Sequence, residues 1–218
     1  MEDLYKKLKG VESSQSRDVI ESLENLNEYQ KAAVMDHSRV LLVNAQVGSG
    51  KTTVLTSKIL YLHFVKSIPL ESMVVLTFTN KAAEEIKCRI KEKNQNITDE
   101  EMRFFGTFHG VCRVLLASVL PVEEQGYTRE FSILGADEMY EVYERVINEN
   151  NLSVKYRNKL KRRIEKYKNG KLLYGNMKHD DDISDFLKLL KEEKKRCNVM
   201  EFDDLIENAL ILLKRYPI

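Results

Sequence analysis

Residues 45–52, A-Q-V-G-S-G-K-T, lie between two stretches with different hydrophobic patterns. An apolar run at residues 40–43 precedes them, and an amphipathic helical pattern at residues 51–66 follows them. A glycine-rich turn between a strand and a helix lets backbone N–H groups point inward at an anion, and the helix adds its positive dipole end. The segment therefore predicts a phosphate-binding loop that follows a buried strand.

Two residues of this loop carry the predicted chemistry. Lys51 is expected to bring its charge to the β- and γ-phosphates of ATP, and Thr52 to offer its hydroxyl to Mg²⁺. Ala45 stands where the general pattern has glycine, so a plain glycine turn is the alternative interpretation. The other predicted nucleotide contacts from the loop and the following turn are Ala45, Gln46, Val47, Gly48, Ser49, Gly50 and Thr53.

The composition is that of an ordinary globular protein. The chain has 218 residues, 43% hydrophobic residues, three prolines and a formal net charge of +1. No apolar run approaches 18 residues, so we expect no membrane segment. Three scattered cysteines without metal-ligand spacing suit buried or free thiols in a reducing cytoplasm. Residues 1–25 are polar and predict an extension that precedes the domain.

Strands alternate with helices in the first half of the chain. Expected strands at residues 40–43 and 73–78 are followed by helices at 51–66 and 80–93. This alternation predicts an α/β fold of the P-loop NTPase class, with a parallel sheet covered by helices on both faces. From about residue 111 the pattern is almost entirely helical, which predicts an all-helical subdomain grafted into the α/β core or placed after it. Its expected helices are residues 111–120, 136–148, 154–168, 183–196 and 202–215, with one extended piece at 130–134.

Residues 155–171 contain nine basic residues and one acid. Leu160, Ile164 and Tyr167 are spaced as the apolar seam of an amphipathic helix, so the basic residues fall on its outer face. A solvated face is one interpretation, and a phosphate-contacting surface is the other. The candidate contacts to nucleic acid on this face are Lys159, Lys161, Arg162 and Lys166.

Four segments give the chain a family resemblance. They are L-N-E-Y-Q at residues 26–30, L-T-F-T-N-K-A-A-E-E-I at 76–86, F-G-T-F-H-G at 105–110 and E-F-D-D-L at 201–205. In this order and spacing they resemble the amino-terminal motifs of superfamily 1 DNA helicases of the UvrD, Rep and PcrA group. The resemblance implies a RecA-like ATP-binding lobe at residues 26–112 and a helical insertion at 113–199. Residues 200–218 would then return to the lobe, short of its acidic Walker B strand.

The resemblance also implies roles for individual residues. Gln30 would read the adenine base through its side-chain amide, which both donates and accepts. The implied contacts to single-stranded DNA are the base-stacking Phe78, with Thr79, Asn80, Thr107 and His109. Without the resemblance, Gln30 would be read as an exposed helix residue, Phe78 as core and Asn80 as a helix cap.

The implied activity is ATP-driven 3′-to-5′ translocation on single-stranded DNA with unwinding at duplex junctions. ATP hydrolysis needs carboxylates at the end of an apolar strand, and no such pair is evident. Residues 197–201 are not expected to form a buried strand, and Asp203 and Asp204 are expected to cap the last helix. We therefore expect the chain alone to be inactive and monomeric. The alternatives are a nucleic-acid-binding module without ATP turnover and, less in keeping with residues 76–86, a small-molecule kinase.

Overall fold

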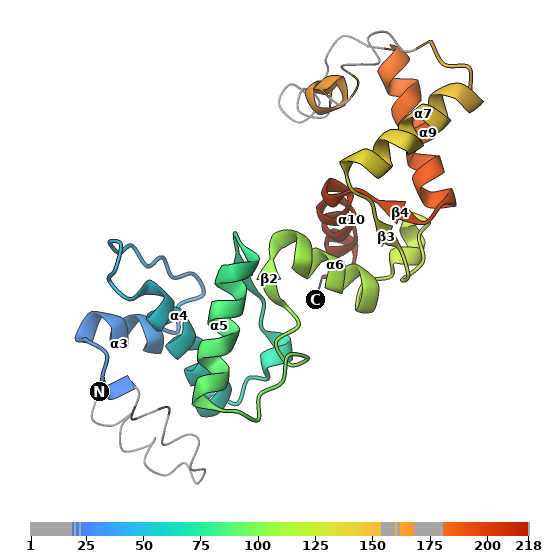
Figure 1. The fold of residues 1–218 in the computed structure, drawn as a ribbon. Coiled ribbons are helices and arrows are strands. Elements are labelled where there is room, and N and C mark those ends of the chain that lie inside the picture. Colours follow the sequence, from blue (N-terminus) through green and yellow to red (C-terminus); the bar gives the residue numbers. More distant parts are fainter. Residues whose placement is uncertain are drawn as a thin grey trace. The chain divides into compact units, whose positions relative to one another are not determined.

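The structure, a computed structural model, describes residues 19, 21, 23–153, 160, 162–167 and 181–217. Its contacts divide the chain into two units, residues 1–111 and 112–218 (Figure 1). Each unit has its own hydrophobic core and is described by itself. The scheme of a lobe, an insertion and a return helix stays a prediction.

The first unit contains a two-stranded parallel sheet. Strand β1 (Val75–Thr77) pairs with β2 (Phe105–Thr107), and Thr77 lies opposite Thr107 at the carboxyl end of the pair. Helix α5 (Asn80–Lys93) connects the two strands, as a parallel pair requires. Parallel pairing, as expected, is confirmed for these two strands, and coverage of the sheet by helices on both faces stays a prediction. The expected strand at 73–78 is shorter than predicted, and β2 was not predicted.

The strand expected at residues 40–43 is wrong for this structure. These residues have no regular secondary structure and their side chains are exposed. Val40 and Leu42 are more than 80% exposed while Leu41 and Val43 are about half as exposed, the alternation of an extended chain. A strand forms only when its backbone groups pair with a neighbour, and no described strand pairs with this segment.

Further helices of the first unit flank the glycine-rich loop and precede the sheet. Helix α3 (Glu28–Met35) precedes the glycine-rich loop, and α4 (Lys51–Leu60) follows it. One π-helical stretch, η1 (Tyr61–Val65), continues α4, so the predicted helix at 51–66 is confirmed. A short 3₁₀ helix, η2 (Leu70–Ser72), leads into β1.

Two hydrophobic clusters form the core of the first unit, and both include residues from the expected amino-terminal extension. Val19 is buried in one cluster and Leu23 in the other. The extension is therefore not wholly separate from the unit. The first cluster has Val19, Ile59, Leu60, Leu70, Val75, Ile86, Ile90, Ile97, Met102 and Phe105, and the second has Leu23, Leu26, Val34, Val54 and Tyr61.

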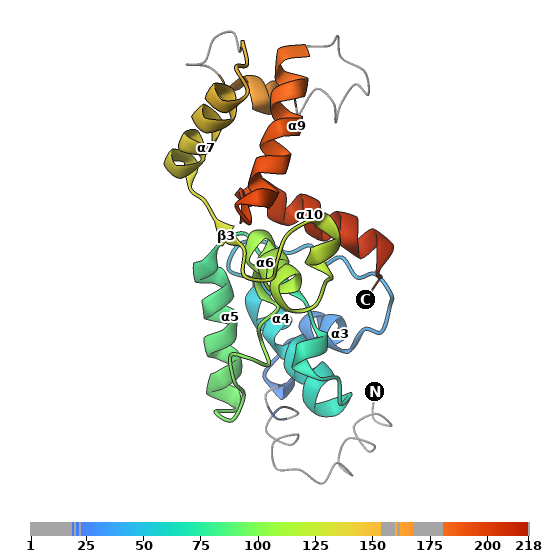
Figure 2. The ribbon, with the colours of Figure 1, turned by 90° about the vertical axis from the view of Figure 1, so that its right-hand side faces the viewer.

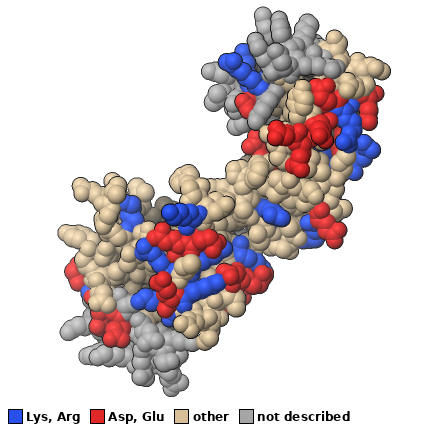
Figure 3. Space-filling model, viewed as in Figure 1, with Lys and Arg blue, Asp and Glu red and all other residues tan. Residues whose placement is uncertain are grey.

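The surface of the first unit carries charges of both signs. Figure 3 shows Lys and Arg side chains among Asp and Glu on the visible face. On α5, Lys87 pairs with Glu84 at 3.1 Å and Arg89 with Glu85 at 2.6 Å. Exposed pairs at this spacing each stabilise a helix only slightly. These pairs place opposite charges next to one another on the surface of α5.

The second unit is mainly helical. Helix α6 (Phe108–Ser118) crosses the boundary between the units and is followed by the 3₁₀ helix η3 (Val122–Gln125). Helices α7 (Ala136–Glu149), α9 (Asp181–Arg196) and α10 (Phe202–Arg215) agree closely with the predicted helices. The prediction of an all-helical subdomain is wrong, because β3 (Ser132–Ile133) pairs in parallel with β4 (Val199–Met200).

Helices α7 and α9 share one hydrophobic core (Figure 2). Leu160 and Ile164 are buried in it, and Tyr167 packs against it partly buried. The predicted apolar seam is therefore confirmed at these three residues. The buried members are Met139, Val142, Tyr143, Val146, Ile147, Leu160, Ile164, Ile183, Phe186 and Leu190.

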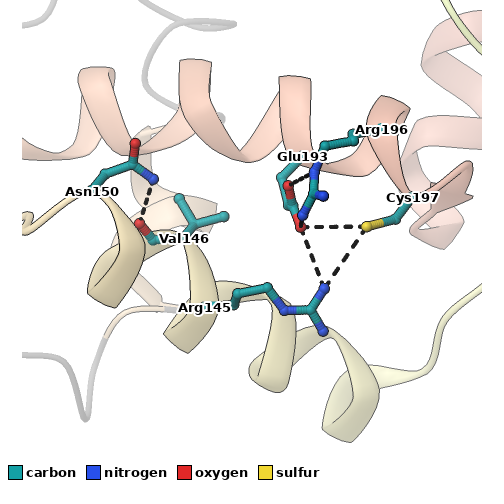
Figure 4. Close-up of polar contacts among 6 residues, drawn as sticks. All are labelled: Arg145, Val146, Asn150, Glu193, Arg196 and Cys197. Carbon is teal, nitrogen blue, oxygen red and sulfur yellow. Dashed lines mark hydrogen bonds and ion pairs between the residues drawn. The ribbon is translucent and has the colours of Figure 1, made fainter.

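Glu193 joins these two helices on the polar side (Figure 4). Arg196, one turn away on α9, donates to both of its carboxylate oxygens at 2.7 Å, and Arg145 of α7 lies 3.4 Å from it. The thiol of Cys197 also donates to Glu193. Hydrogen bonds from Arg196 are the main cause that holds the pKa of Glu193 below its ordinary value.

A largely buried ion network joins α9 to the start of α10. The Lys194 ammonium donates to both carboxylate oxygens of Asp204, at 2.8 and 2.6 Å, and to Glu201 at 3.1 Å. Burial opposes the charge of Lys194, but the two carboxylates outweigh it and the pKa of Lys194 is raised. Tyr143 donates to Glu201 from α7. The network fixes the start of α10 on the core of this unit.

Among the described helices, none combines the length and the apolar character that crossing a bilayer requires.

Candidate nucleotide and nucleic-acid site

The loop at residues 45–52 adopts the predicted tight turn. Gly48 and Gly50 have φ angles of 80° and 85°, a region that glycine enters without steric cost. Gly50 is also the N-cap residue directly before α4, so the first N–H groups of that helix face the loop. The two glycines therefore supply the curl that phosphate binding needs.

The ammonium of Lys51 lies against the loop itself. It donates to the carbonyl oxygens of Ala45 at 2.8 Å and Gln46 at 2.7 Å. The Ser49 hydroxyl also donates to Gln46, at 2.7 Å. Because an ammonium has three donors, one remains for a ligand. Gln46 thus contributes through its backbone carbonyl, and its side chain is exposed.

The residues around the loop suit the binding of an anionic ligand together with its bound metal cation. Residues 45–53 contain no acidic residue, and they place a lysine at the amino terminus of a helix. Thr52 and Thr53 occupy the first turn of α4, partly buried and exposed respectively. Val47 is fully exposed at the tip of the loop. A triphosphate with Mg²⁺ would therefore meet donors and positive charge here.

Gln30 is attached to this loop from α3. Its Nε2 donates to the Ser49 carbonyl at 3.0 Å, and its Oε1 accepts from the Asn27 N–H at 3.0 Å. Asn27 in turn accepts from the backbone N–H of Gln30, which completes a capping box at the start of α3. These partners fix which end of the amide is oxygen, since the Asn27 N–H only donates and the Ser49 carbonyl only accepts.

The predicted DNA contacts gather at one end of the sheet in the first unit. Because β1 and β2 are parallel and in register, Phe78 and Phe108 leave adjacent strands at the same edge. Phe78 is 96% exposed, so within the described chain it is not a core residue. Phe108, which the sequence did not single out, is 48% exposed. Two accessible aromatic rings at one edge suit the stacking of bases.

The threonines at this edge begin helices. Thr79 accepts from the Ala82 N–H at 3.1 Å and caps α5, and Thr107 accepts from the Gly110 N–H at 3.2 Å. Asn80 is the first residue of α5, so the alternative that Asn80 is the cap is wrong. His109 is partly buried in the first turn of α6. The predicted residues are brought together, with two hydroxyls engaged by backbone N–H groups.

The candidate basic surface is only partly within the described residues. Arg162 and Lys166 are exposed on the helix whose other face buries Leu160 and Ile164. Lys159 and Lys161 lie outside the described residues. The two described cations thus have the outward position that contact with phosphates would need.

The two aspartates near the end of the chain have a structural setting. Asp204 is buried, binds Lys194 and accepts from the Glu201 N–H at 2.8 Å, so its expected capping role is confirmed. Asp203 is exposed in the first turn of α10. The expectation that residues 197–201 form no buried strand is wrong, because Val199 and Met200 are buried in β4. A two-residue strand suffices here because β3 offers a backbone partner.

Sequence reasoning missed residues that organise this site. The Asn27 capping box was detectable, since N-x-x-Q at a helix start is its signature. Lys58 was not detectable. Its ammonium donates to the carbonyls of Ala33 and Asp36, and such long-range contacts leave no local pattern.

Comparison with known proteins places the chain among helicases. Residues 26–217 match the family model described as the UvrD/REP helicase N-terminal domain. The chain is 31% identical over 208 residues to the ATP-dependent DNA helicase UvrD1 of Mycobacterium bovis, covering 89% of this chain and 26% of that protein. It is 32% identical over 208 residues to the ATP-dependent DNA helicase PcrA of Bacillus subtilis, covering 89% of this chain and 27% of that protein. The chain therefore spans about a quarter of the length of these relatives.

Proposed function

The chain belongs to the UvrD/REP helicase family, and on this premise we propose that it is the ATP- and DNA-binding amino-terminal portion of an ATP-dependent DNA helicase. The observation that carries the proposal is the loop at residues 45–52, in which two glycines curl the backbone, Lys51 donates to the loop carbonyls and Gln30 is attached from α3. The RecA-like lobe and the helical insertion are part of this proposal.

The hydrogen bonds of Gln30 support recognition of adenine. A side-chain amide has two N–H donors and two acceptor lone pairs. Asn27 uses one lone pair and Ser49 one N–H, which leaves one acceptor and one donor. The adenine edge offers the complementary pair, an amino donor beside a ring-nitrogen acceptor. Gln30 can therefore bind the base without releasing the loop.

Different residues of the loop would contact different parts of the nucleotide and its Mg²⁺. Lys51 contributes its remaining donor and its charge to the phosphates, while backbone N–H groups at the start of α4 add further donors. Thr52 would hold Mg²⁺, which supplies charge neutralisation for phosphoryl transfer when bound. Ala45, Gln46, Val47, Gly48, Ser49, Gly50 and Thr53 complete the proposed nucleotide contacts.

The sheet edge supplies the proposed contact to single-stranded DNA. Phe78 offers a ring for a base, Thr79 and Asn80 directly follow it in sequence, and Thr107 and His109 lie at and just after the end of the paired strand β2, where they would meet the backbone on either side. Their hydroxyl, amide and imidazole groups suit phosphates without sequence preference. Arg162 and Lys166, with Lys159 and Lys161, would meet duplex phosphates at a junction.

In the whole protein these contacts would serve 3′-to-5′ movement in the cytoplasm, with the present chain inactive alone and monomeric. A specific observation favours a second candidate, a nucleic-acid-binding module without ATP turnover. Of the paired aspartates at 203–204, Asp204 is already bound to Lys194, so within the described residues this pair does not offer two carboxylates to Mg²⁺.

One experiment on the full-length protein separates the two functions. Strand displacement is measured with ATP and Mg²⁺ on duplexes that carry a 3′ or a 5′ single-stranded tail. The helicase proposal predicts displacement on the 3′-tailed duplex only, and loss of that activity with Lys51→Ala while binding of single strands persists. Binding of single strands without ATP hydrolysis by the wild-type protein would instead support the module.

A further inference from the structure

The carboxyl end of α3 is held by a cation from another helix. The Lys58 ammonium of α4 donates to the Ala33 carbonyl at 3.2 Å and to the Asp36 carbonyl at 2.6 Å. A helix leaves its last carbonyls without intrahelical partners, and a positive charge there is favourable. α3 has no basic residue of its own in its last turn, so Lys58 supplies what the helix lacks.

The other end of α3 is bound to the start of α4. Gln30 stands in the first turn of α3 and donates to Ser49, directly before Gly50 and α4. The beginning of α3 is therefore attached to the beginning of α4, and the end of α3 is attached to the end of α4. Between these two attachments, Val34 of α3 is buried with Val54 and Tyr61 of α4 and its continuation.

α3 needs this support because it has only eight residues. An isolated helix of that length is marginal in water, and tertiary contacts determine whether and where it forms. A side chain that reads a base must be held to within roughly half an ångström to be selective. The position of the Gln30 amide therefore depends on what fixes α3 against α4.

We propose that Lys58 is a positioning residue for recognition of the nucleotide base, which fixes α3 on α4 so that the Gln30 amide stays beside the phosphate-binding loop. This rests on the proposed function, because it needs a nucleotide in that loop. Lys58 does not touch the ligand in this account. It acts through Gln30, and this dependence can be measured.

The test compares ATP with GTP on the 218-residue chain. Guanine presents a carbonyl where adenine presents an amino group, so an amide oxygen that favours adenine disfavours guanine. Competition of each nucleotide, with Mg²⁺, against a ribose-labelled fluorescent ADP gives the ratio of the two dissociation constants. Lys58→Met, Gln30→Ala and the double variant are measured with wild type. Lys31→Met is the matched control, because Lys31 lies on α3 and its ammonium pairs only with Glu28 at 3.5 Å among the described contacts.

Lys58→Met is expected to reduce the preference for ATP by roughly three- to tenfold, the effect of about one hydrogen bond. GTP affinity should change little. Gln30→Ala should reduce the preference for ATP by the same factor. The double variant should lose no more of this preference than either single variant, and Lys31→Met should keep all of it. An unchanged ratio in Lys58→Met, or additive losses in the double variant, would overturn the inference.

A replacement variant and the binding of nucleotide by the wild-type chain complete the test. If Lys58→Met does not fold, Lys58→Gln takes its place, because its neutral amide keeps a polar end but is one atom shorter and lacks the charge that holds both carbonyls. Its ATP preference should fall, and an unchanged preference overturns the inference. A wild-type chain that binds neither nucleotide overturns the proposed function itself, which separates that failure from the failure of Lys58 to position Gln30.

Discussion

The side-chain amide of Gln30 donates to the main-chain oxygen of Ser49 at 3.0 Å, which links α3 to the proposed phosphate-binding loop across 19 positions of sequence. The loop and the residue proposed to read the base are thereby parts of one hydrogen-bonded structure. Any change that displaces Gln30 should alter nucleotide selectivity. Any change in the conformation of the loop should in turn alter the position of the Gln30 side chain.

Gly50→Ala should disrupt this link. A Cβ at Gly50 would lie 2.8 Å from the Gln30 Nε2, so the amide would have to move. Gly48→Ala is the matched control, because Gly48 also has a positive φ but a Cβ there meets nothing within 4 Å. Both variants carry backbone strain of about 1–2 kcal/mol. We expect only Gly50→Ala to lose the preference for ATP over GTP in competition binding, and equal losses in both would show that strain alone is responsible.

Phe78→Ala should weaken binding of single-stranded DNA. The ring is almost fully exposed at the end of β1, and stacking of one base contributes about 1–3 kcal/mol. The affinity of the chain for a fluorescent oligothymidine should therefore fall at least severalfold. Tyr140→Ala removes another exposed aromatic ring, on α7, and should leave binding unchanged. Wild-type affinity in Phe78→Ala would remove this residue from the interface.

Arg162→Ala combined with Lys166→Ala should reduce the salt dependence of duplex binding. Each phosphate contact that is lost lowers the slope of log affinity against log salt concentration by about one. Titrations of a blunt duplex at several salt concentrations measure that slope. The exchange Arg162→Lys with Lys166→Arg keeps both charges and should keep the slope. A slope that does not change in the alanine variant would identify this helix face as merely solvated.

Lys194→Met should destabilise the second unit by about 3–5 kcal/mol, because it leaves the buried carboxylate of Asp204 without its cationic partner. Hydrogen exchange of α9 and α10 in increasing urea measures this loss locally. Lys188→Met removes an exposed pair with Asp185 and should change stability by no more than about 1 kcal/mol. Equal protection in both variants would show that the buried network contributes little.

The sequence predicted those elements whose boundaries have local chemical causes. α5 begins after the cap Thr79, and α10 begins after the capping box of Glu201, and both occupy the predicted residues. The turn at Gly48 and Gly50 was predicted because few other residues enter that conformation. Local signals of this kind are complete within a few residues of sequence.

Long-range partners account for what the sequence did not predict. The apolar pattern of residues 40–43 favours a strand, but a strand also needs a neighbour for its backbone groups, and periodicity says nothing about that neighbour. The short pairing of β3 with β4 was missed for the same reason. In the sequence, Lys58 and Lys194 resemble ordinary surface lysines on amphipathic helices. In the structure, Lys58 donates to backbone carbonyls and Lys194 donates to carboxylates.

Nucleotide binding by the chain tests the central claim most directly. Calorimetric titration of the 218-residue chain with ATP and Mg²⁺ should show one site, and Lys51→Ala should weaken it at least about tenfold because a charge on the phosphates is lost. Lys87→Ala, which removes a lysine paired with Glu84 on α5, should leave the affinity unchanged. Equal affinity of Lys51→Ala and wild type, or no binding by wild type, would contradict the assignment of residues 45–52 as the nucleotide site.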